Sequence, residues 1–191
     1  MRPAVFLDRD GTLIEEVAGH LDRLDQIAPF PWTADALRLL NRAGFTTIVI
    51  TNQSAVGRGL VTEDFVHRVH AALDARLAAG RARIDRYYFC PHHPHLATAS
   101  YRQRCRCRKP GPAMIEQACA DLGLDPARSW TVGDTWIDVA CGRAAGTRGI
   151  LLKTGHGVRE AANPPDGARA DAILDNLMEA VAWILRTSTS R

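Results

Sequence analysis

Short apolar runs alternate along the chain with stretches whose apolar residues recur at helical spacing. An apolar run of about 4–8 residues that ends at polar residues is typical of a buried parallel strand, whereas a period of about 3.6 residues indicates an amphipathic helix. Thr33 and Thr62 stand where helices are expected to begin, each as an N-cap. The pattern predicts strands at 4–7, 45–50, 84–89, 129–132 and 149–152, and helices at 33–43, 62–79, 113–122, 134–145 and 174–185.

Strands that alternate with helices at this spacing predict a three-layer α/β fold, Rossmann-like, around a central parallel sheet. No long segment is left over to form a large cap domain. We expect a single domain over residues 1–191, with an irregular loop at 90–109 inserted into it and a flexible tail at 187–191. Ligands of such sheets bind beyond the carboxyl ends of the strands, so the chemically informative residues are expected just after each strand.

The composition is that of a globular protein. The chain has 191 residues, of which 46% are hydrophobic and 24% charged, and its formal net charge is +3. This apolar content excludes a disordered chain, and so small a net charge gives no support for nucleic-acid binding. No apolar run approaches the ~20 residues of a membrane span, and the start lacks the apolar region of a secretory signal. We therefore expect a cytoplasmic monomer with no nucleic-acid or membrane partner.

Arginine is used in place of lysine almost everywhere in this chain. Lys109 and Lys153 are the only lysines among the 24 basic residues, a bias that we attribute to genome composition. Because a lysine ammonium is a compact point charge and an arginine guanidinium is a broad fork, a lysine kept against this bias indicates a site that needs a small cation.

Two carboxylates, Asp8 and Asp10, follow the first predicted strand. Gly11 permits a sharp turn that can bring both of them to one pocket. Carboxylate oxygens suit a hard cation such as Mg²⁺ and covalent aspartyl-phosphate chemistry, which favours a nucleophile with an acid/base partner. The alternative is a polar strand end followed by a plain turn.

Residues 8–12, Asp-Arg-Asp-Gly-Thr after an apolar strand, resemble the first motif of the haloacid dehalogenase (HAD) superfamily of phosphohydrolases. The resemblance implies that Asp8 is the nucleophile. It also implies that Asp10 protonates the leaving oxygen and then activates the attacking water.

Three further motifs of the superfamily occur in order, at Thr51, Lys109 and the pair Asp134 and Asp138. By the resemblance, Thr51 and Lys109 stabilise the phosphoryl group. Mg²⁺ is held by Asp8, Asp134 and the backbone carbonyl of Asp10, and Asp138 orients the site from the second shell. Thr51 alone would fit a turn and Asp134 a helix N-cap, but four motifs in order, each after a predicted strand, favour a phosphatase.

A group of cysteines and histidines indicates a metal site. Cys90 and His92, followed by Cys105 and Cys107, supply three thiolates and one imidazole, the tetrahedral set of a structural Zn²⁺. His93 and His95 are spare candidates that the spacing does not exclude. The alternative is a set of reduced cysteines or a redox pair of Cys105 with Cys107.

The predicted metal is structural rather than catalytic, because sites with four protein ligands are closed. We expect it to brace the loop and to fix Arg108 and Lys109 at the active site.

The metal loop narrows the resemblance from the HAD superfamily to one family within it. Residues 90–94 (Cys-Pro-His-His-Pro), 105–110 (Cys-Arg-Cys-Arg-Lys-Pro) and 51–54 (Thr-Asn-Gln-Ser) are similar to the D-glycero-D-manno-heptose 1,7-bisphosphate 7-phosphatases, over about residues 4–155. That family removes the 7-phosphate in nucleotide-activated heptose biosynthesis, for lipopolysaccharide, and in it the histidine directly after Cys-Pro, here His92, is the metal ligand. The implied substrate contacts are Thr51, Asn52, Gln53, Ser54, Arg108 and Lys109.

The chain departs from this family at two places. Residues 15–20 lack the usual asparagine and have the glycine displaced, so no substrate contact is assigned there. Thr135 stands where a lysine is common, which removes one positive charge near the phosphate. The second phosphate of the substrate would account for a basic loop, although two or three of its four arginines are expected to be solvated surface: Arg102, Arg104, Arg106 and Arg108.

Three alternative functions remain at this point. Histidinol-phosphate phosphatase is related but has a typically shorter metal loop, and another small sugar phosphate is an equivalent alternative. From a different class, the chain could be a zinc-braced binding module without catalysis. The complete catalytic set argues against that module: Asp8, Asp10, Thr51, Lys109 and Asp134.

Overall fold

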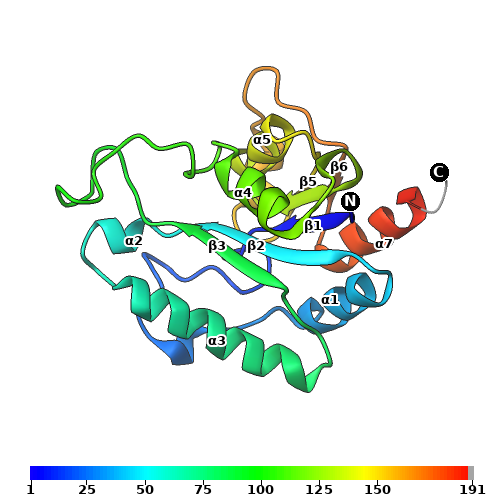
Figure 1. The fold of residues 1–191 in the computed structure, drawn as a ribbon, viewed down its shortest axis with the longest axis horizontal. Helices are drawn as coiled ribbons and strands as arrows, with labels where there is room; N and C mark the ends of the chain where they lie inside the picture. Colours follow the sequence, from blue (N-terminus) through cyan, green and yellow to red (C-terminus); the bar gives the residue numbers. More distant parts are fainter. Residues whose placement is uncertain (189–191) are drawn as a thin grey trace.

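The computed structural model describes residues 1–188, and its centre is a six-stranded sheet (Figure 1). Neighbouring strands pair in parallel, in the order β3-β2-β1-β4-β5-β6. The predicted three-layer α/β fold is confirmed. The strands are β1 (Ala4–Leu7), β2 (Thr46–Asn52), β3 (Arg86–Cys90), β4 (Trp130–Gly133), β5 (Arg148–Leu152) and β6 (Ala172–Leu174).

Helices cover both faces of the sheet. In Figure 1, α1, α3 and α7 lie on one side of it and α4 and α5 on the other, and the apolar core is divided in the same way. Among residues 1–188, no helix combines the length and the apolar character needed to cross a membrane. The helices are α1 (Thr33–Arg42), α2 (Ser54–Gly57), α3 (Glu63–Ala79), α4 (Ala113–Leu122), α5 (Trp136–Ala144), α6 (Gly157–Ala162) and α7 (Leu177–Ser188), with short 3₁₀ turns at Leu24–Gln26 and Pro126–Arg128.

Strand β1 lies in the middle of the sheet and supplies the core on both of its faces. Val5 and Leu7 pack into the core under α1 and α7, whereas Ala4 and Phe6 pack into the core under α4. All four side chains are fully buried, which explains why the strand is apolar throughout and why its predicted limits are confirmed. The first polar residue after it, Asp8, therefore emerges at the carboxyl edge of the sheet.

The two predicted helix starts have different outcomes. Thr62 is the N-cap of α3, and its hydroxyl accepts a hydrogen bond from the Phe65 N–H at 3.1 Å, as predicted. The prediction for Thr33 is wrong, because this residue is already the first of α1 and Trp32 precedes it as the N-cap. The Thr33 hydroxyl instead donates to the Leu13 carbonyl at 2.7 Å, which fixes the connection after β1 to the helix.

The C-terminal part contains two elements that the sequence pattern did not predict, α6 and β6. Strand β6 has three residues and lies at the edge of the sheet, and α6 has six residues, so neither produces a clear period. Helix α7 begins at Leu177 rather than 174 and runs to Ser188. Thr187 and Ser188 thus belong to the helix and not to the predicted tail, whose residues 189–191 lie outside the described residues.

Two long connections leave the carboxyl edge of the sheet. Residues 8–32 follow β1 with only one 3₁₀ turn, and residues 91–112 follow β3 without a helix or strand. The second connection packs against α2 and α3, where Gly57 accepts a backbone bond from Thr98 at 2.7 Å and the Tyr101 hydroxyl donates to Glu63 at 2.8 Å. Both connections return toward the end of β1 and bring polar residues there.

A buried histidine in α3 makes the stability of the fold depend on pH. His70 is 5% exposed and its ring stacks on that of Tyr87 at 4.2 Å. Burial, and then the charges of Arg9 and His67, lower the pKa of His70 to about 3, with a smaller opposing effect of Asp10. The unfolded chain, with a histidine pKa of about 6.5, therefore binds the proton first, and stability falls as the pH drops from about 6.5 toward 3.

We predict that His70→Phe removes this loss of folding stability at acid pH. By linkage the loss amounts to about 2 kcal/mol at about pH 5, and it is measured as the difference in the free energy of urea unfolding between pH 7 and pH 5. His95→Phe, a change of an exposed histidine in the 91–112 connection, is the control and should keep the pH dependence of the wild type. An unchanged pH dependence in His70→Phe would show that His70 is not the group responsible.

Candidate active site and metal cluster

Four of the residues predicted from the sequence meet at the carboxyl edge of the sheet. Asp8 follows β1, and Thr51 and Asp134 lie at the ends of β2 and β4, the two strands that flank β1. Lys109 comes from the 91–112 connection, and its ammonium reaches Asp8. These residues come together because parallel strands end at one edge of the sheet.

Lys109 is the buried cation of this site, with an exposed fraction of 4%. Its Nζ lies 2.7 Å from Asp8 Oδ1 and 2.6 Å from Asp138 Oδ1, and it donates to the Ile50 carbonyl at 2.9 Å. The Asn52 side chain binds the backbone of Lys109, donating to its carbonyl at 3.1 Å and accepting from its N–H at 3.0 Å. Three acceptors close around one nitrogen suit a compact ammonium better than a guanidinium.

Burial and the close approach of several carboxylates determine the pKa values of the charged groups in this site. Burial alone would lower the pKa of Lys109, but Asp138 and Asp8 outweigh it and the pKa is raised above its usual value. Burial also raises the pKa of Asp8, against the opposing effect of Lys109. It raises the pKa of Asp134 to about 6. The site is therefore short of positive charge, which is the deficit that a divalent cation fills.

The geometry of the acidic residues fits such a cation. Carboxylate oxygens of Asp8, Asp134 and Asp138 all lie within 4.8 Å of one another. Asp138 is already engaged, since one oxygen faces Lys109 and the other accepts from the Thr135 hydroxyl at 2.6 Å. Thr135, rather than Asp134, is the N-cap of α5. Asp8 and Asp134 thus keep oxygens free, of the type that Mg²⁺ prefers.

Two glycines allow the chain to close around the Asp134 carboxylate. Gly11 has a φ of +74°, and a Cβ at this position would lie 2.5 Å from Asp134 Oδ2. Gly155, with a φ of +51°, packs against the same carboxylate, and the His156 N–H donates to Oδ2 at 2.7 Å. The sharp turn predicted at Gly11 is therefore present, and it leaves no room for a side chain.

Asp10 lies outside this acidic cluster, and its carboxylate is held by protein donors. Arg9 donates hydrogen bonds to Asp10 Oδ1 from Nε at 3.1 Å and from Nη2 at 3.0 Å. Its Nη2 also donates to Asp10 Oδ2 at 2.8 Å. The Gln53 amide donates to Asp10 Oδ2 at 3.0 Å and to the Thr51 hydroxyl at 2.9 Å. Gln53 and Asn52, both predicted as substrate contacts, thus direct their amides at protein groups.

A cavity of 390 Å³ opens over the site. A second cavity of 170 Å³ adjoins it, since Asp10, Glu16, Asn52 and Ser54 line both. The first is lined by Asp8, Asp10, Glu16, Thr51, Asn52, Ser54, Arg108, Lys109, Asp134, Thr135, Ile137, Asp138 and His156. A small polar molecule with a phosphate group fits a space of this size and lining.

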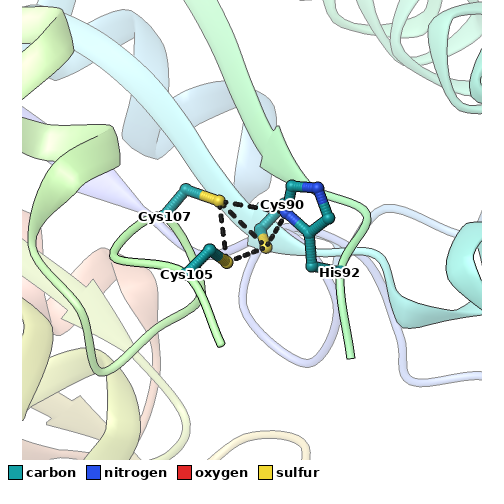
Figure 2. A group of neighbouring side chains, drawn as sticks. All are labelled: Cys90, His92, Cys105 and Cys107. Atoms are coloured by element: carbon teal, nitrogen blue, oxygen red, sulfur yellow. Dashed lines mark hydrogen bonds between the residues drawn. The ribbon is translucent and has the colours of Figure 1, made fainter. Parts of the chain in front are cut away.

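Figure 2 shows the second cluster, in which Cys90, His92, Cys105 and Cys107 point toward one another. The Cys107 sulfur lies 3.0 Å from that of Cys105 and 3.3 Å from that of Cys90, and 3.4 Å from His92 Nδ1. The four donor atoms are close enough for one ion to contact all of them. Burial raises the pKa of the Cys90 thiol, so a thiolate at this position needs a cation to stabilise it.

The two spare histidines are not part of this cluster. His93 Nδ1 accepts backbone N–H groups of His95 and Leu96 at 3.2 and 3.0 Å, so it caps a turn of the loop. His95 is exposed. The choice among three histidines, which the spacing left open, is decided by these local bonds.

The four arginines of the loop separate into two groups. Arg106 binds Glu116 on the surface at 2.7 Å, and Arg102 donates to a backbone carbonyl at 3.0 Å, so both make structural contacts. Arg108 also donates to a backbone carbonyl, that of His92 at 3.2 Å, but it lines the active-site cavity, and with Arg104 it lines an adjoining cavity of 280 Å³. Only Arg104 and Arg108 are therefore placed to meet an anion near the site.

Sequence reasoning missed three residues of the site. Arg9 occupies the variable position between the two motif aspartates, where the motif assigns no role. Glu16 and His156 come from different connections, and their side chains approach to 3.9 Å at the cavity wall. No local pattern links these two residues, so only the structure could bring them together.

A parallel α/β sheet whose carboxyl edge joins an aspartate directly after the central strand, a buried lysine and further aspartates is the arrangement of a HAD-type phosphatase. The family model described as HAD-hydrolase-like matches residues 106–180. The crystal structure of D,D-heptose 1,7-bisphosphate phosphatase from B. bronchiseptica, complexed with magnesium and phosphate, is similar with a TM-score of 0.85. It is 27% identical in sequence and covers 97% of this chain and 99% of its own.

Curated relatives show to which family of HAD-type phosphatases the chain belongs. The D-glycero-D-manno-heptose-1,7-bisphosphate 7-phosphatase of Chlorobaculum tepidum is 36% identical, over 98% of this chain and 96% of its own. The D-glycero-beta-D-manno-heptose-1,7-bisphosphate 7-phosphatase of Escherichia coli K12 is 39% identical, over 93% and 91%. The chain belongs to the D-glycero-D-manno-heptose-1,7-bisphosphate 7-phosphatase family and is a phosphomonoester hydrolase. The resemblance drawn from its motifs is confirmed.

Proposed function

We propose that the chain removes the 7-phosphate of D-glycero-D-manno-heptose 1,7-bisphosphate through an aspartyl-phosphate on Asp8, in the biosynthesis of nucleotide-activated heptose for lipopolysaccharide. The observation that carries this proposal is the position of Asp8, a carboxylate in a polar cavity that contacts a buried ammonium. Similarity to heptose bisphosphatases over nearly the whole chain supports the substrate. The chain acts in the cytoplasm as a monomer, one domain over residues 1–191 with the metal loop inserted.

In the first step an oxygen of Asp8 attacks the phosphorus of the 7-phosphoryl group. The new Asp8–phosphorus bond forms as the bond from phosphorus to the sugar oxygen breaks, and Asp10 gives its proton to that oxygen, which leaves as a hydroxyl. Lys109 and Thr51 donate to the phosphoryl oxygens as their charge shifts. Asp8, Asp134 and the Asp10 carbonyl would hold Mg²⁺, which would supply positive charge to neutralise the phosphoryl group.

In the second step Asp10, now ionised, takes a proton from a water molecule whose oxygen attacks the phosphorus. The bond to Asp8 breaks, and inorganic phosphate leaves. Asp8 is again a carboxylate and Asp10 again carries a proton, so one group serves as acid and then as base. No further base is required to close the cycle.

The remaining phosphate and the sugar are recognised by the walls of the cavity. Arg108 binds the phosphate that is not cleaved, since a guanidinium fork matches phosphate oxygens and this side chain lines the cavity. Ser54 contacts the sugar. Thr135 carries no charge, and its hydroxyl already donates to Asp138 at 2.6 Å.

We propose that Cys90, His92, Cys105 and Cys107 hold one structural Zn²⁺. The donor set supports zinc, since three sulfurs and one imidazole nitrogen are its usual tetrahedral ligands. The ion would join the end of β3 to the segment directly before Lys109, and so fix the position of the catalytic ammonium.

Replacing Cys107 tests this role of the metal. Cys107→Ser should lower the zinc content from about one ion per chain and lower the melting temperature by about 10 °C or more, because metal binding energy is folding energy. Elemental analysis and thermal unfolding measure the two effects. Cys119→Ser, on helix α4 and outside the cluster, is the control and should keep the metal. Purified wild type without a bound metal would contradict the zinc assignment.

Phosphate release from three substrates tests the function itself. The kcat/KM for heptose 1,7-bisphosphate should exceed those for histidinol phosphate and fructose 1,6-bisphosphate by about 10²-fold or more, since a polar site rejects ligands that leave its groups unpaired. Histidinol phosphate as the best substrate would make the chain a histidinol-phosphate phosphatase. No hydrolysis of any phosphate ester would favour a zinc-braced binding module.

A further inference from the structure

Arg9 lies between Asp8 and Asp10 in the sequence, yet its guanidinium is among the most buried side chains of the protein, with 2% exposure. Asp10 is the one carboxylate in residues 1–188 with which it forms an ion pair, at 2.8 Å. Its Nη1 is buried and makes no hydrogen bond to the described residues. Removing an arginine from water costs several kcal/mol, and Asp10 provides the main compensation.

The contact with Arg9 sets the orientation of the Asp10 carboxyl group as well as pairing its charge. Two nitrogens of the guanidinium, Nε and Nη2, bind Asp10 Oδ1, and Nη2 also reaches Oδ2, so the plane of the carboxyl group is set by a rigid fork. Gln53, 9% exposed, adds a bond to Oδ2 and another to the Thr51 hydroxyl. Asp10 is therefore held in a fixed orientation relative to Thr51, the proposed phosphoryl contact.

We propose that Arg9 is a positioning residue that aims the Asp10 carboxyl group at the leaving oxygen of the substrate. The inference rests on the proposed function, in which Asp10 passes its proton to the sugar oxygen as the phosphorus–oxygen bond breaks. Arg9 does not line the cavity over Asp8 and Lys109 but the adjoining one of 170 Å³, so it acts on the reacting atoms through Asp10. A carboxyl group free to rotate would spend less time in reach of the leaving oxygen, and proton transfer requires such contact.

This role predicts a dependence on the leaving group. A sugar alkoxide is a poor leaving group and needs the proton, whereas p-nitrophenolate is a stable anion that leaves without one. The kcat/KM reports the steps up to the first irreversible one, the departure of the alcohol, so it isolates the step in which Asp10 acts as an acid. Misplacing Asp10 should therefore lower kcat/KM for heptose 1,7-bisphosphate far more than for p-nitrophenyl phosphate.

The experiment compares Arg9→Lys, which keeps the charge and loses the fork, with the wild type on both substrates. We expect kcat/KM to fall by about 10²-fold for heptose 1,7-bisphosphate and by less than about threefold for p-nitrophenyl phosphate, since general acid catalysis contributes about 10²–10⁴-fold. Arg106→Lys, at the surface pair with Glu116, is the control and should change neither value.

Both substrates are measured on one preparation, so a fraction of unfolded protein cancels in the ratio of the two kcat/KM values. Equal losses on both substrates for Arg9→Lys would overturn the inference, because a merely structural arginine affects both reactions alike. Asp10→Asn separates this failure from a failure of the proposed function. If Asp10→Asn also lost both activities equally, the acid role of Asp10 would be wrong, and the inference about Arg9 with it.

Discussion

Asp8→Asn is expected to lower the rate of phosphate release by about 10⁴-fold or more while the protein stays folded. The asparagine has the same shape and can still accept a hydrogen bond from Lys109, which lies 2.7 Å from Asp8 in the wild type. Its amide is a poor nucleophile, so the bond from this side chain to phosphorus no longer forms. Steady-state phosphate release, with the melting temperature as a check on folding, measures the effect.

A matched control comes from a surface aspartate. Asp35 is exposed in α1, where it pairs with Arg38, and Asp35→Asn should leave the rate unchanged. A rate in Asp8→Asn close to that of the wild type would exclude the covalent mechanism and leave direct attack of water as the alternative.

Lys109→Met is expected to lower kcat/KM by about 10³-fold. Its ammonium lies between Asp8 and Asp138, 2.7 and 2.6 Å from their oxygens, and it is the cation available to a phosphoryl group bound at Asp8. Removing it leaves two buried carboxylates without their shared partner, so we also expect a loss of stability of about 3 kcal/mol or more. Kinetics on heptose 1,7-bisphosphate and urea unfolding measure the two effects separately.

The chain contains its own control for this change, because it has one other lysine. Lys153 is exposed and pairs with Asp175 on the surface, so Lys153→Met should change neither quantity appreciably. Lys109→Arg should not restore activity, since the broader guanidinium does not fit between Asp8, Asp138 and the Ile50 carbonyl. Activity of Lys109→Arg near that of the wild type would show that the site needs only a positive charge.

The catalytic set could be predicted from the sequence because strong local signals fix its members. Asp8 follows a run of four apolar residues that ends at acids, the pattern of a buried parallel strand, and parallel strands end at one edge. Asp134 is placed by the same rule after β4. Lys109 could be singled out because arginine is used almost everywhere else in the chain.

The partners of these residues could not be predicted, because they are set by side-chain packing and not by periodicity. Asn52 and Gln53 belong to a motif read as substrate-binding, yet their amides bind the Lys109 backbone and Asp10. Arg9 is charged and would be expected at the surface, but its ion pair with Asp10 allows it to be buried. Short elements could not be predicted for a related reason: the three residues of β6 are partly exposed and show no clear pattern.

The identity of the phosphate that leaves tests the central claim most directly. Heptose 1,7-bisphosphate carries one phosphate on the primary C7 oxygen and one on the anomeric C1 oxygen, and ³¹P NMR of the product distinguishes the two esters. The account predicts that heptose 1-phosphate and inorganic phosphate accumulate together, and that neither forms with Asp8→Asn. Accumulation of heptose 7-phosphate, or equal turnover by Asp8→Asn, would contradict it.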